Sequence, residues 1–274
     1  MAITTVLVHL DTGEATRARL ETAIALVRDH GARLIGLHIR PVVDIRSVAQ
    51  AYVGTNFIAE QERVASETAA RIEAEFLDRA ERAGVTAEWR CEKGDVYDLV
   101  ARHARYVDVA IVGQTPPNDP EGLFFLQIPE QVALTAGRPV IVVPYIGGYP
   151  EIGKRVVVAW NGSREATRAV HDALSILEKA QRVVVLSIDP GERRHIPGAD
   201  IAALLARHGV RAEASETSSG EIRVGDVLLS RAADLSADLI VMGAYGHSRA
   251  REWVTGGVTR HLLAHMTVPV LMSH

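Results

Sequence analysis

The amino-acid sequence predicts an α/β fold made of two tandem Rossmann-like domains. Short apolar runs rich in Val and Ile alternate with segments of helical spacing, which is typical of βαβ units and a parallel sheet. The runs are almost continuously apolar, as strands buried on both faces require. The second half of the chain also repeats the pattern of the first. We therefore expect two sheets of five parallel strands, each with helices on both faces.

Ten apolar runs are expected to form strands, five in each half of the chain. They are short and separated by helical patterns, so each is long enough for a strand and too short for a helix. The expected strands are Thr4–Leu10, Arg33–Ile39, Ala87–Cys91, Val107–Val112, Pro139–Pro144, Arg155–Trp160, Arg182–Ile188, Val210–Ser215, Leu239–Met242 and Pro269–Met272.

Three of the intervening segments show the spacing of amphipathic helices. The first has apolar residues on one face from Leu20 to Val27, and Gly31 then offers a C-terminal stop. A longer helix is expected from Ala65 to Ala80. The third is expected as one helix between Ser163 and Lys179.

The two halves align segment by segment. VHLDTGEATRARLETAIAL from Val8 matches VAWNGSREATRAVHDALSI from Val158, and VDVAIVG ending at Gly113 matches ADLIVMG ending at Gly243. GRPVIVVP likewise matches TVPVLMSH. Glycine and proline break the pattern at YIGGYPEIGK, so we expect domains at residues 1–147 and 152–274. The first is longer, and residues 41–58 are expected to hold an inserted loop or short helix.

The composition is that of a globular protein and argues against several classes. The chain has 274 residues, of which 47% are hydrophobic and 23% charged, unlike a disordered protein. Its net charge of −4 argues against general binding to nucleic acid or acidic membranes. We expect no membrane span, because no run approaches ~18 apolar residues, and no signal peptide. The single cysteine, Cys91, excludes an internal disulfide framework and fits a cytoplasmic protein.

A long loop of the second half joins an expected strand to an expected helix and is bounded by glycines. It reads Gly243-x2-Gly246-x9-Gly256-Gly257. Glycine lets the backbone approach an anion closely, and the free N–H groups of the following helix would face a phosphate there. The other interpretation is that these glycines serve only as turns.

The loop differs from a Walker loop, which requires a lysine beside its last glycine. The chain has three lysines, and none lies in this loop. Arg249 and Arg251 lie there instead, and they either contact phosphate or solvate the loop. Because open parallel sheets bind ligands beyond the carboxyl ends of their strands, we expect the loop to meet the segment Ala159–Ser163.

With these motifs the sequence resembles a tandem universal stress protein of the UspA type. The family's fingerprint is G-x2-G-x9-G-(S/T) followed by V-(S/T), and its D-G-S motif is matched by Asn161-Gly162-Ser163. The two repeats cover nearly the whole chain. The resemblance implies the adenine nucleotide alpha hydrolase-like form of the Rossmann fold. Many members of the family bind ATP with these elements, and others bear the fold without a nucleotide.

Carried over to this sequence, the resemblance implies a nucleotide site in the second half. The ligand would be ATP or a related adenine nucleotide, with Mg²⁺ as an optional companion. The residues implied beside the adenosine are Ala159, Trp160, Asn161 and, at the adenine edge, Ser187. Those implied along the ribose and phosphates are Met242, Gly243, Gly246, His247, Gly256, Gly257, Val258 and Thr259.

Two positions depart from the family's pattern, and one aromatic residue has two interpretations. Asn161 replaces the usual Asp, which keeps a hydrogen-bonding group and removes the charge. Gly257 replaces Ser or Thr, which removes one hydroxyl and keeps the backbone N–H. Trp160 is expected either to stack near adenine or to pack under the inserted loop.

The first half keeps Asp11 but has lost the glycine loop. Gly113 is followed by QTPPNDPEGLFFLQIPEQV, where Pro116 stands in place of the second glycine and Pro117 and Pro120 stiffen the segment. Proline has no N–H to offer a phosphate. We therefore interpret this half as a degenerate partner without a nucleotide.

No constellation of catalytic or metal-binding residues is evident. His261 and His265 share a helix face but are too few for a zinc site. His247 and Ser248 lack the surroundings of a nucleophile elbow. Efficient catalysis is therefore not expected, although slow ATP hydrolysis stays open.

The resemblance favours a stress-response protein that binds an adenine nucleotide in the second domain only. The alternative is a nucleotide-free interaction module that keeps the same fold. In single-domain members of the family the last strands meet across a dimer interface, so the fused chain is expected to pair them internally. A homodimer of the whole chain stays open.

Overall fold

The computed structural model describes residues 2–41, 55–114, 128–190, 198–246 and 257–274. The inserted region of the first half lies largely outside these ranges, and helix α2 begins at Thr55. The first half contains β1 (Thr5–His9), α1 (Thr16–His30), β2 (Arg33–Pro41), α2 (Thr55–Arg82), β3 (Ala87–Gly94), α3 (Val96–Ala104), β4 (Val109–Gly113), α4 (Ile128–Thr135) and β5 (Val140–Val143).

The second half repeats this order of strands and helices. It contains β6 (Arg155–Ala159), α5 (Arg164–Asp172), α6 (Leu174–Leu177), β7 (Arg182–Ile188), α7 (Ala199–Arg207), β8 (Ala212–Thr217), α8 (Val224–Asp234), β9 (Leu239–Gly243), α10 (Val258–His265) and β10 (Val270–Ser273). All ten expected strands are confirmed, and their bounds differ from the prediction by at most a few residues. The single helix expected between Ser163 and Lys179 was wrong, because a turn at Ala173 divides it into α5 and α6.

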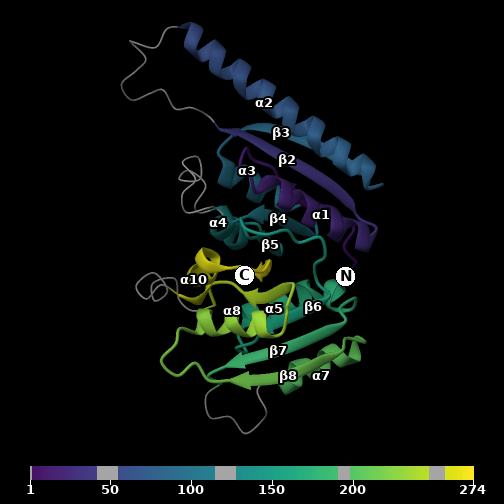
Figure 1. Cartoon of the computed structure of the whole chain (residues 1–274), viewed down its shortest axis with the longest axis vertical. Coiled ribbons are helices and arrows are strands. Elements are labelled where there is room, and N and C mark those ends of the chain that lie inside the picture. The colour runs from purple at the N-terminus through teal and green to yellow at the C-terminus, as the bar shows by residue number, and fades with distance from the viewer. Residues whose placement is uncertain (1, 42–54, 115–127, 191–197, 247–256) are drawn as a thin grey trace.

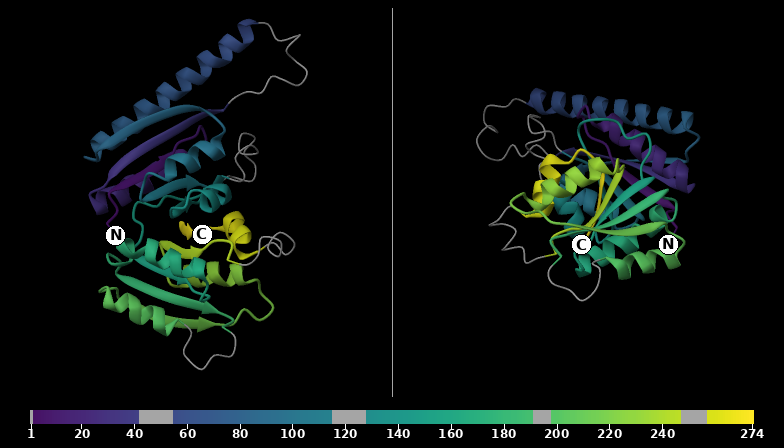
Figure 2. Two further views of the ribbon diagram at one scale, coloured as in Figure 1. Left: turned by 180° about the vertical axis from the view of Figure 1, so that it is seen from behind. Right: turned by 60° about the horizontal axis from the view of Figure 1, so that its bottom comes forward.

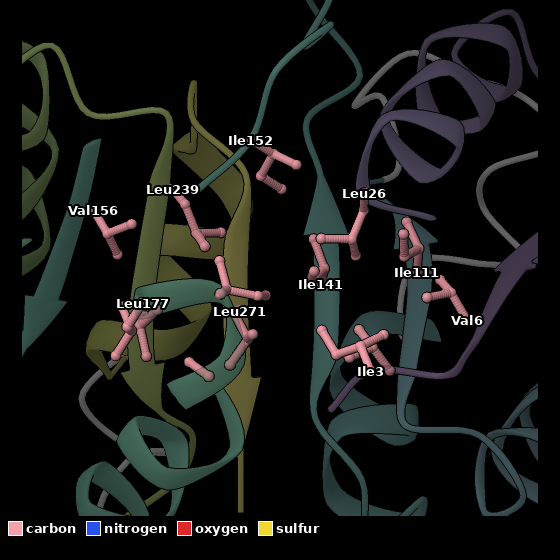
Figure 3. Close-up of a cluster of buried hydrophobic side chains, with 14 of the residues drawn as sticks. Ile3, Val6, Leu26, Ile111, Ile141, Ile152, Val156, Leu177, Leu239 and Leu271 are labelled. Carbon is pink, nitrogen blue, oxygen red and sulfur yellow. The ribbon is translucent and has the colours of Figure 1, made fainter. Parts of the chain in front are cut away.

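The ten strands form one continuous sheet in the order β3-β2-β1-β4-β5-β10-β9-β6-β7-β8. Within each half all strand pairs are parallel, whereas β5 and β10 pair antiparallel at the junction, with Leu271 opposite Ile141. Figure 3 shows these two side chains among the apolar residues that run across the junction from both halves. The expected internal pairing of the last strands is therefore confirmed, and it leaves no edge exposed at the centre of the molecule.

Helices cover both faces of this sheet (Figure 1 and Figure 2). On one face, the buried core joins residues of α1, α2, α5, α6 and α7 to alternate strand residues such as Val6 and Val158. On the other face, α3, α4, α8 and α10 pack on strand residues such as Leu7 and Val157. This alternation follows from the two-residue period of a strand, and it explains why the strands read as unbroken apolar runs.

An aspartate at the equivalent position of each half anchors the first strand of that half. Asp108 accepts hydrogen bonds from the backbone N–H groups of Thr4 and Thr5, at 2.8 and 3.0 Å. Asp238, at the matching place of the second half, accepts from the N–H groups of Gly153, Lys154 and Arg155 at 2.8 to 3.1 Å. The repeat seen in the sequence is therefore also a repeat of side-chain contacts.

Candidate functional site

The carboxyl ends of β6, β7 and β9 and the amino ends of α8 and α10 surround a cavity of about 390 Å³. This volume lies in the range of small-molecule sites, roughly 300–1,000 Å³. The cavity is on the α8 and α10 face of the sheet, at the edge where open parallel sheets bind ligands. The described residues that line it are Ala159, Trp160, Asn161, Leu186, Ile188, Val224, Leu228, Met242, Gly243, Tyr245, Gly246, Gly257, Val258 and Thr259.

The cavity brings together most of the site residues expected from the sequence. Twelve were expected, and two of them, His247 and Gly256, lie outside the described residues, as do Ser248, Arg249 and Arg251. Of the remaining ten, all except Ser187 line the cavity. Trp160 is among them, so its place beside the site is observed.

The structure places Ser187 on the opposite face of β7. Its neighbours Leu186 and Ile188 line the cavity, and side chains alternate between the faces of a strand. The Ser187 hydroxyl is buried beside Gly198 and has no hydrogen-bond partner among the described residues. A contact between this side chain and a ligand in the cavity is therefore not seen.

The strand-end glycines are required by close packing and not by unusual backbone angles. Neither Gly243 nor Gly246 has a positive φ, which weighs against the interpretation that they serve as turns. A Cβ on Gly243 would lie 2.5 Å from the backbone of Glu165 and Ala166 in α5. A Cβ on Gly246 would lie 2.9 Å from Oε2 of Glu165. Both glycines thus let the loop sit directly against the start of α5.

Two helix N-termini open onto the cavity without side-chain caps. Gly257 precedes α10, Arg223 precedes α8, and neither helix receives a hydrogen bond from its capping side chain. The first N–H groups of a helix lack partners inside the helix and carry a partial positive charge. Two such ends beside one cavity favour an anionic ligand.

The hydroxyl of Thr259 lies at the start of α10 and can donate a hydrogen bond. Its Oγ1 accepts from the backbone N–H of Tyr245 at 3.5 Å, and Tyr245 itself adopts the left-handed conformation, with φ of 56°. A hydroxyl has one hydrogen to donate as well as lone pairs to accept. Thr259 therefore holds the loop and offers a donor at the cavity.

Asn161 uses its oxygen within its own turn. Its Oδ1 accepts from the N–H of Ser163 at 3.0 Å, and the Ser163 hydroxyl in turn caps α5 by accepting from Ala166 at 3.1 Å. The side-chain amide still has its NH₂ group, which can only donate. The replacement of Asp by Asn thus turns an acceptor into a donor at this edge of the cavity.

None of the described lining residues carries a charge. Glu165, an acid beside Gly246, is largely buried on the α5 side of the loop. Burial favours the neutral form of Glu165, but its own backbone N–H and Arg164 outweigh this effect and hold its pKa below the usual value. Among the described residues, the lining is therefore uncharged, and the backbone N–H groups at the starts of α8 and α10 contribute partial positive charge.

The family comparison matches both halves of this chain. The model of the universal stress protein family matches residues 2–144 and again residues 153–274. The chain belongs to the universal stress protein family. Comparison with curated proteins gives no significant match.

Solved structures of universal stress proteins resemble the chain in fold. A universal stress protein from Archaeoglobus fulgidus DSM 4304 is 17% identical, with 98% of this chain and 95% of that chain covered and a TM-score of 0.79. A functionally unknown protein from Pseudomonas aeruginosa PAO1 is 15% identical, with 99% and 92% covered and a TM-score of 0.55. A universal stress family protein from Arabidopsis thaliana, solved with AMP bound, is 13% identical, with 52% and 91% covered and a TM-score of 0.36.

The first half of this universal stress protein has ionisable groups where the second half has neutral ones. Arg19 is 3% exposed, and its Nη2 lies 2.7 Å from Oδ2 of Asp11. Burial favours protonation of Asp11, but Arg19, His9 and a hydrogen bond from Thr16 outweigh it and hold the pKa well below its usual range. The carboxylate kept from the family's pattern is therefore occupied by an internal cation.

Two buried histidines lie beside this ion pair. His9 is 2% exposed, and its burial lowers its pKa to about 4 although Asp11 opposes the shift. His38 is also buried, which lowers its pKa, and its Nδ1 lies 2.7 Å from the carbonyl of Leu10. Both rings are thus neutral at physiological pH.

The first half also has a cavity, but it lies on the α1 and α2 face of the sheet. It has a volume of about 410 Å³ and is lined by the end of β1 and by residues of α1 and α2, among them Leu20, Ile72 and Phe76. These helices cover the face opposite to α8 and α10. Pro116, Pro117 and Pro120, which led us to expect the loss of a nucleotide site here, lie outside the described residues.

Five lining residues were missed from the sequence. Leu186 and Ile188 flank Ser187, and strand alternation alone would have selected them. Tyr245 lies inside the glycine fingerprint, whereas Val224 and Leu228 belong to a helix that was not predicted individually.

His261 and His265, which share a face of α10, are stacked, with ring centroids 4.3 Å apart. A ring nitrogen of His261, Nε2, lies 2.6 Å from Oδ1 of Asp226.

Proposed function

We propose that this protein binds ATP or a related adenine nucleotide in the cavity of its second half. In this proposal it acts in the stress response as a nucleotide-binding protein of the cytoplasm and not as an efficient enzyme. The observation that carries the proposal is the convergence on one cavity of nine residues implied by the family fingerprint. The uncapped starts of α8 and α10 supply the donors that a phosphate chain needs.

The walls of the cavity suit a nucleoside. Leu186, Ile188 and Met242 form apolar surface on the strand side, Leu228 adds apolar surface from α8, and Trp160 adds an aromatic ring. The phosphates would lie toward Gly257 and Thr259. Because no carboxylate is found among the described lining residues, Mg²⁺ would enter on the phosphates of the nucleotide.

The test is a calorimetric titration of the full chain with ATP, ADP, AMP and adenosine. We expect one site per chain and weaker binding of adenosine than of ATP. Two equivalent sites would contradict the degenerate first half. No adenine nucleotide binding at millimolar concentration would reject the proposal in favour of the nucleotide-free interaction module.

A matched pair of variants places the site. Val224 is half-buried and lines the cavity, whereas Ile222 is 62% exposed, two residues away, and does not line it. Val224→Trp should weaken ATP binding at least about tenfold, or ~1.4 kcal/mol, because the indole occupies the ligand's space. Ile222→Trp should leave the affinity within about twofold. Equal affinities of the two variants would show that ATP binds elsewhere.

A further inference from the structure

Helix α10 begins at the cavity and packs against the first half of the chain. Val258 and Thr259, its first residues, line the cavity. Further along, Leu262 and Leu263 belong to the same buried cluster as Ile128 and Val132 of α4. The helix whose N-terminus faces the proposed phosphates is therefore supported from the other half.

Gln114 of the first half makes a directional hydrogen bond to α10. Its side chain is only 5% exposed, and its Nε2 donates to the carbonyl of Leu263 at 2.7 Å. Its Oε1 accepts from the backbone N–H of Tyr145 at 3.2 Å. One end of the amide must donate and the other must accept, so the two partners fix its orientation.

The acceptor of this bond lies at a helix end. Leu263 is in the last turn of α10, where carbonyl groups have no partner inside the helix. Gln114 supplies that partner from the first half, across 149 residues of sequence. A second link between the halves, from Arg260 to Glu130 of α4 at 3.5 Å, lies on the same helix but is more exposed.

The repeat shows that the contact is not reciprocal. Gln114 follows Gly113, and the matching residue after Gly243 is Ala244, which has no side-chain donor. The carbonyl of Ala244 is instead approached by Nδ1 of His274 at 2.9 Å. Where the second half begins its glycine loop, the first half therefore has a residue that holds the partner's helix.

We propose that Gln114 is a positioning residue through which the first half sets the nucleotide affinity of the second. By fixing the end of α10, Gln114 fixes the direction of the N–H groups at Gly257 and the hydroxyl of Thr259. A tilt of this short helix moves those donors relative to the phosphates and leaves the strand-side contacts with the nucleoside in place. This inference rests on the proposed nucleotide site.

The test compares ATP with adenosine for variants of the full chain. Gln114→Glu has the same shape and keeps the acceptor for Tyr145, but it sets a carboxylate oxygen against the Leu263 carbonyl. We expect ATP affinity to fall at least about fivefold and adenosine affinity to change less than about twofold. Gln114→Met, which removes both hydrogen bonds, should act in the same direction and serves if Gln114→Glu does not fold.

The control variant removes a different contact between the halves. Lys154→Met abolishes an ion pair in which Nζ of Lys154 lies 2.7 Å from Oδ2 of Asp29. Neither residue belongs to α10. The variant should leave the ratio of ATP to adenosine affinity unchanged. Equal losses for ATP and adenosine in the Gln114 variants would reduce the residue to a structural role and overturn the inference.

Hydrogen exchange of the ligand-free protein separates this inference from the proposed function. The Gln114 variants should exchange faster in α10 than the parent, with little change in α7 at the far end of the sheet. If the parent binds no adenine nucleotide, the proposed function fails and this measurement alone decides whether Gln114 holds α10. Unchanged exchange in α10 would overturn the positioning role.

Discussion

At matching positions near the strand ends, the first half carries ionisable side chains and the second half carries neutral ones. Alignment and strand register give four such pairs, with the residue of the first half named first: His9 and Ala159, Asp11 and Asn161, Arg19 and Ala169, and His38 and Ser187. Beside Gly113 the space is filled by Arg19, whose Nη1 lies 1.8 Å from where a Cβ would be. Beside Gly243 it is filled by the backbone of α5.

This difference teaches how one repeated fold can carry two different kinds of strand end. In the first half the carboxylate of Asp11 is paired with Arg19 inside the protein, so its charge is already compensated. The second half presents no charged side chain among the described lining residues and leaves helix ends uncapped. The first half thus pairs its strand-end charges with one another, and its cavity is lined by charged residues such as Arg17 and Glu75, whereas the described lining of the cavity in the second half is uncharged.

The largest expected effect comes from removing the internal cation. Arg19→Met leaves the half-buried carboxylate of Asp11 without its partner, and breaking a pair whose cation is buried should lower the free energy of unfolding by about 3 kcal/mol. Urea unfolding at pH 7 measures this loss. The double variant Asp11→Asn with Arg19→Met, which approaches the neutral pair of the second half, should recover most of it. No recovery would mean that the guanidinium matters for packing and not for charge.

The second effect is a dependence of stability on pH to which a buried histidine of the first half contributes. An unfolded histidine takes up a proton below about pH 6.5, whereas His9 resists protonation until about pH 4. The unfolded state therefore binds more protons in this window, and His9 should lower stability by about 3 kcal/mol as the pH drops from 7 to 4.

Replacing the buried ring tests the source of that slope. His9→Gln should reduce the slope of unfolding free energy against pH between 7 and 4, whatever its stability at pH 7, while His30 and His38, whose pKa values are also lowered by burial, keep their share of the slope. His208, which is exposed on the second half, provides the control, since His208→Gln should leave the slope unchanged. A parent-like slope in His9→Gln would assign the effect to other groups.

A smaller loss is expected from adding a methyl group at the strand end of the second half. Gly243→Ala sets a Cβ 2.5 Å from the backbone of α5, which cannot rotate away, and should cost about 2 kcal/mol. Thermal or urea unfolding measures it. Gly148→Ala is the control, because no described residue lies within 4 Å of its added Cβ and its φ is not positive. Equal stability of both variants would contradict the close packing of the loop on α5.

The smallest effect concerns one hydroxyl at the start of α10. Thr259→Ala should weaken ATP binding by about 1 kcal/mol, the usual net value of one hydrogen bond, and leave adenosine binding nearly unchanged. Thr167 of α5 does not line the cavity, so Thr167→Ala should bind both ligands like the parent. Titration calorimetry with the two ligands distinguishes a phosphate contact from a loss of loop order.

The fold could be predicted almost completely, because hydrophobic periodicity and the internal repeat both report on burial. Leu186 and Leu239 lie in runs whose burial on both faces is typical of a parallel sheet. The turn at Ala173 could not be predicted, since the apolar spacing from Ala166 to Leu177 continues through it and carries no signal of a break.

The candidate site could be predicted where a motif fixes the backbone, and not where the contact depends on a face of the sheet. Gly243 and Gly246 line the cavity, as expected from the fingerprint, and they also pack on α5. Ser187 was implied by the resemblance at the adenine edge, but strand alternation turns its hydroxyl away from the cavity. Gln114 carried no local signal, because its partner Leu263 is distant in sequence and close only after β5 pairs with β10.

The antiparallel seam between β5 and β10 makes the chain a pair of complementary fragments. If the two halves were produced as separate polypeptides, each would present a buried apolar strand, Val140–Val143 or Val270–Ser273, in need of a partner. Two copies of the second half would bring Ala244 to the place of Gln114, and no amide would reach the Leu263 carbonyl. A mixture of unlike halves restores that bond, so reassembly should favour the mixed pair over either like pair.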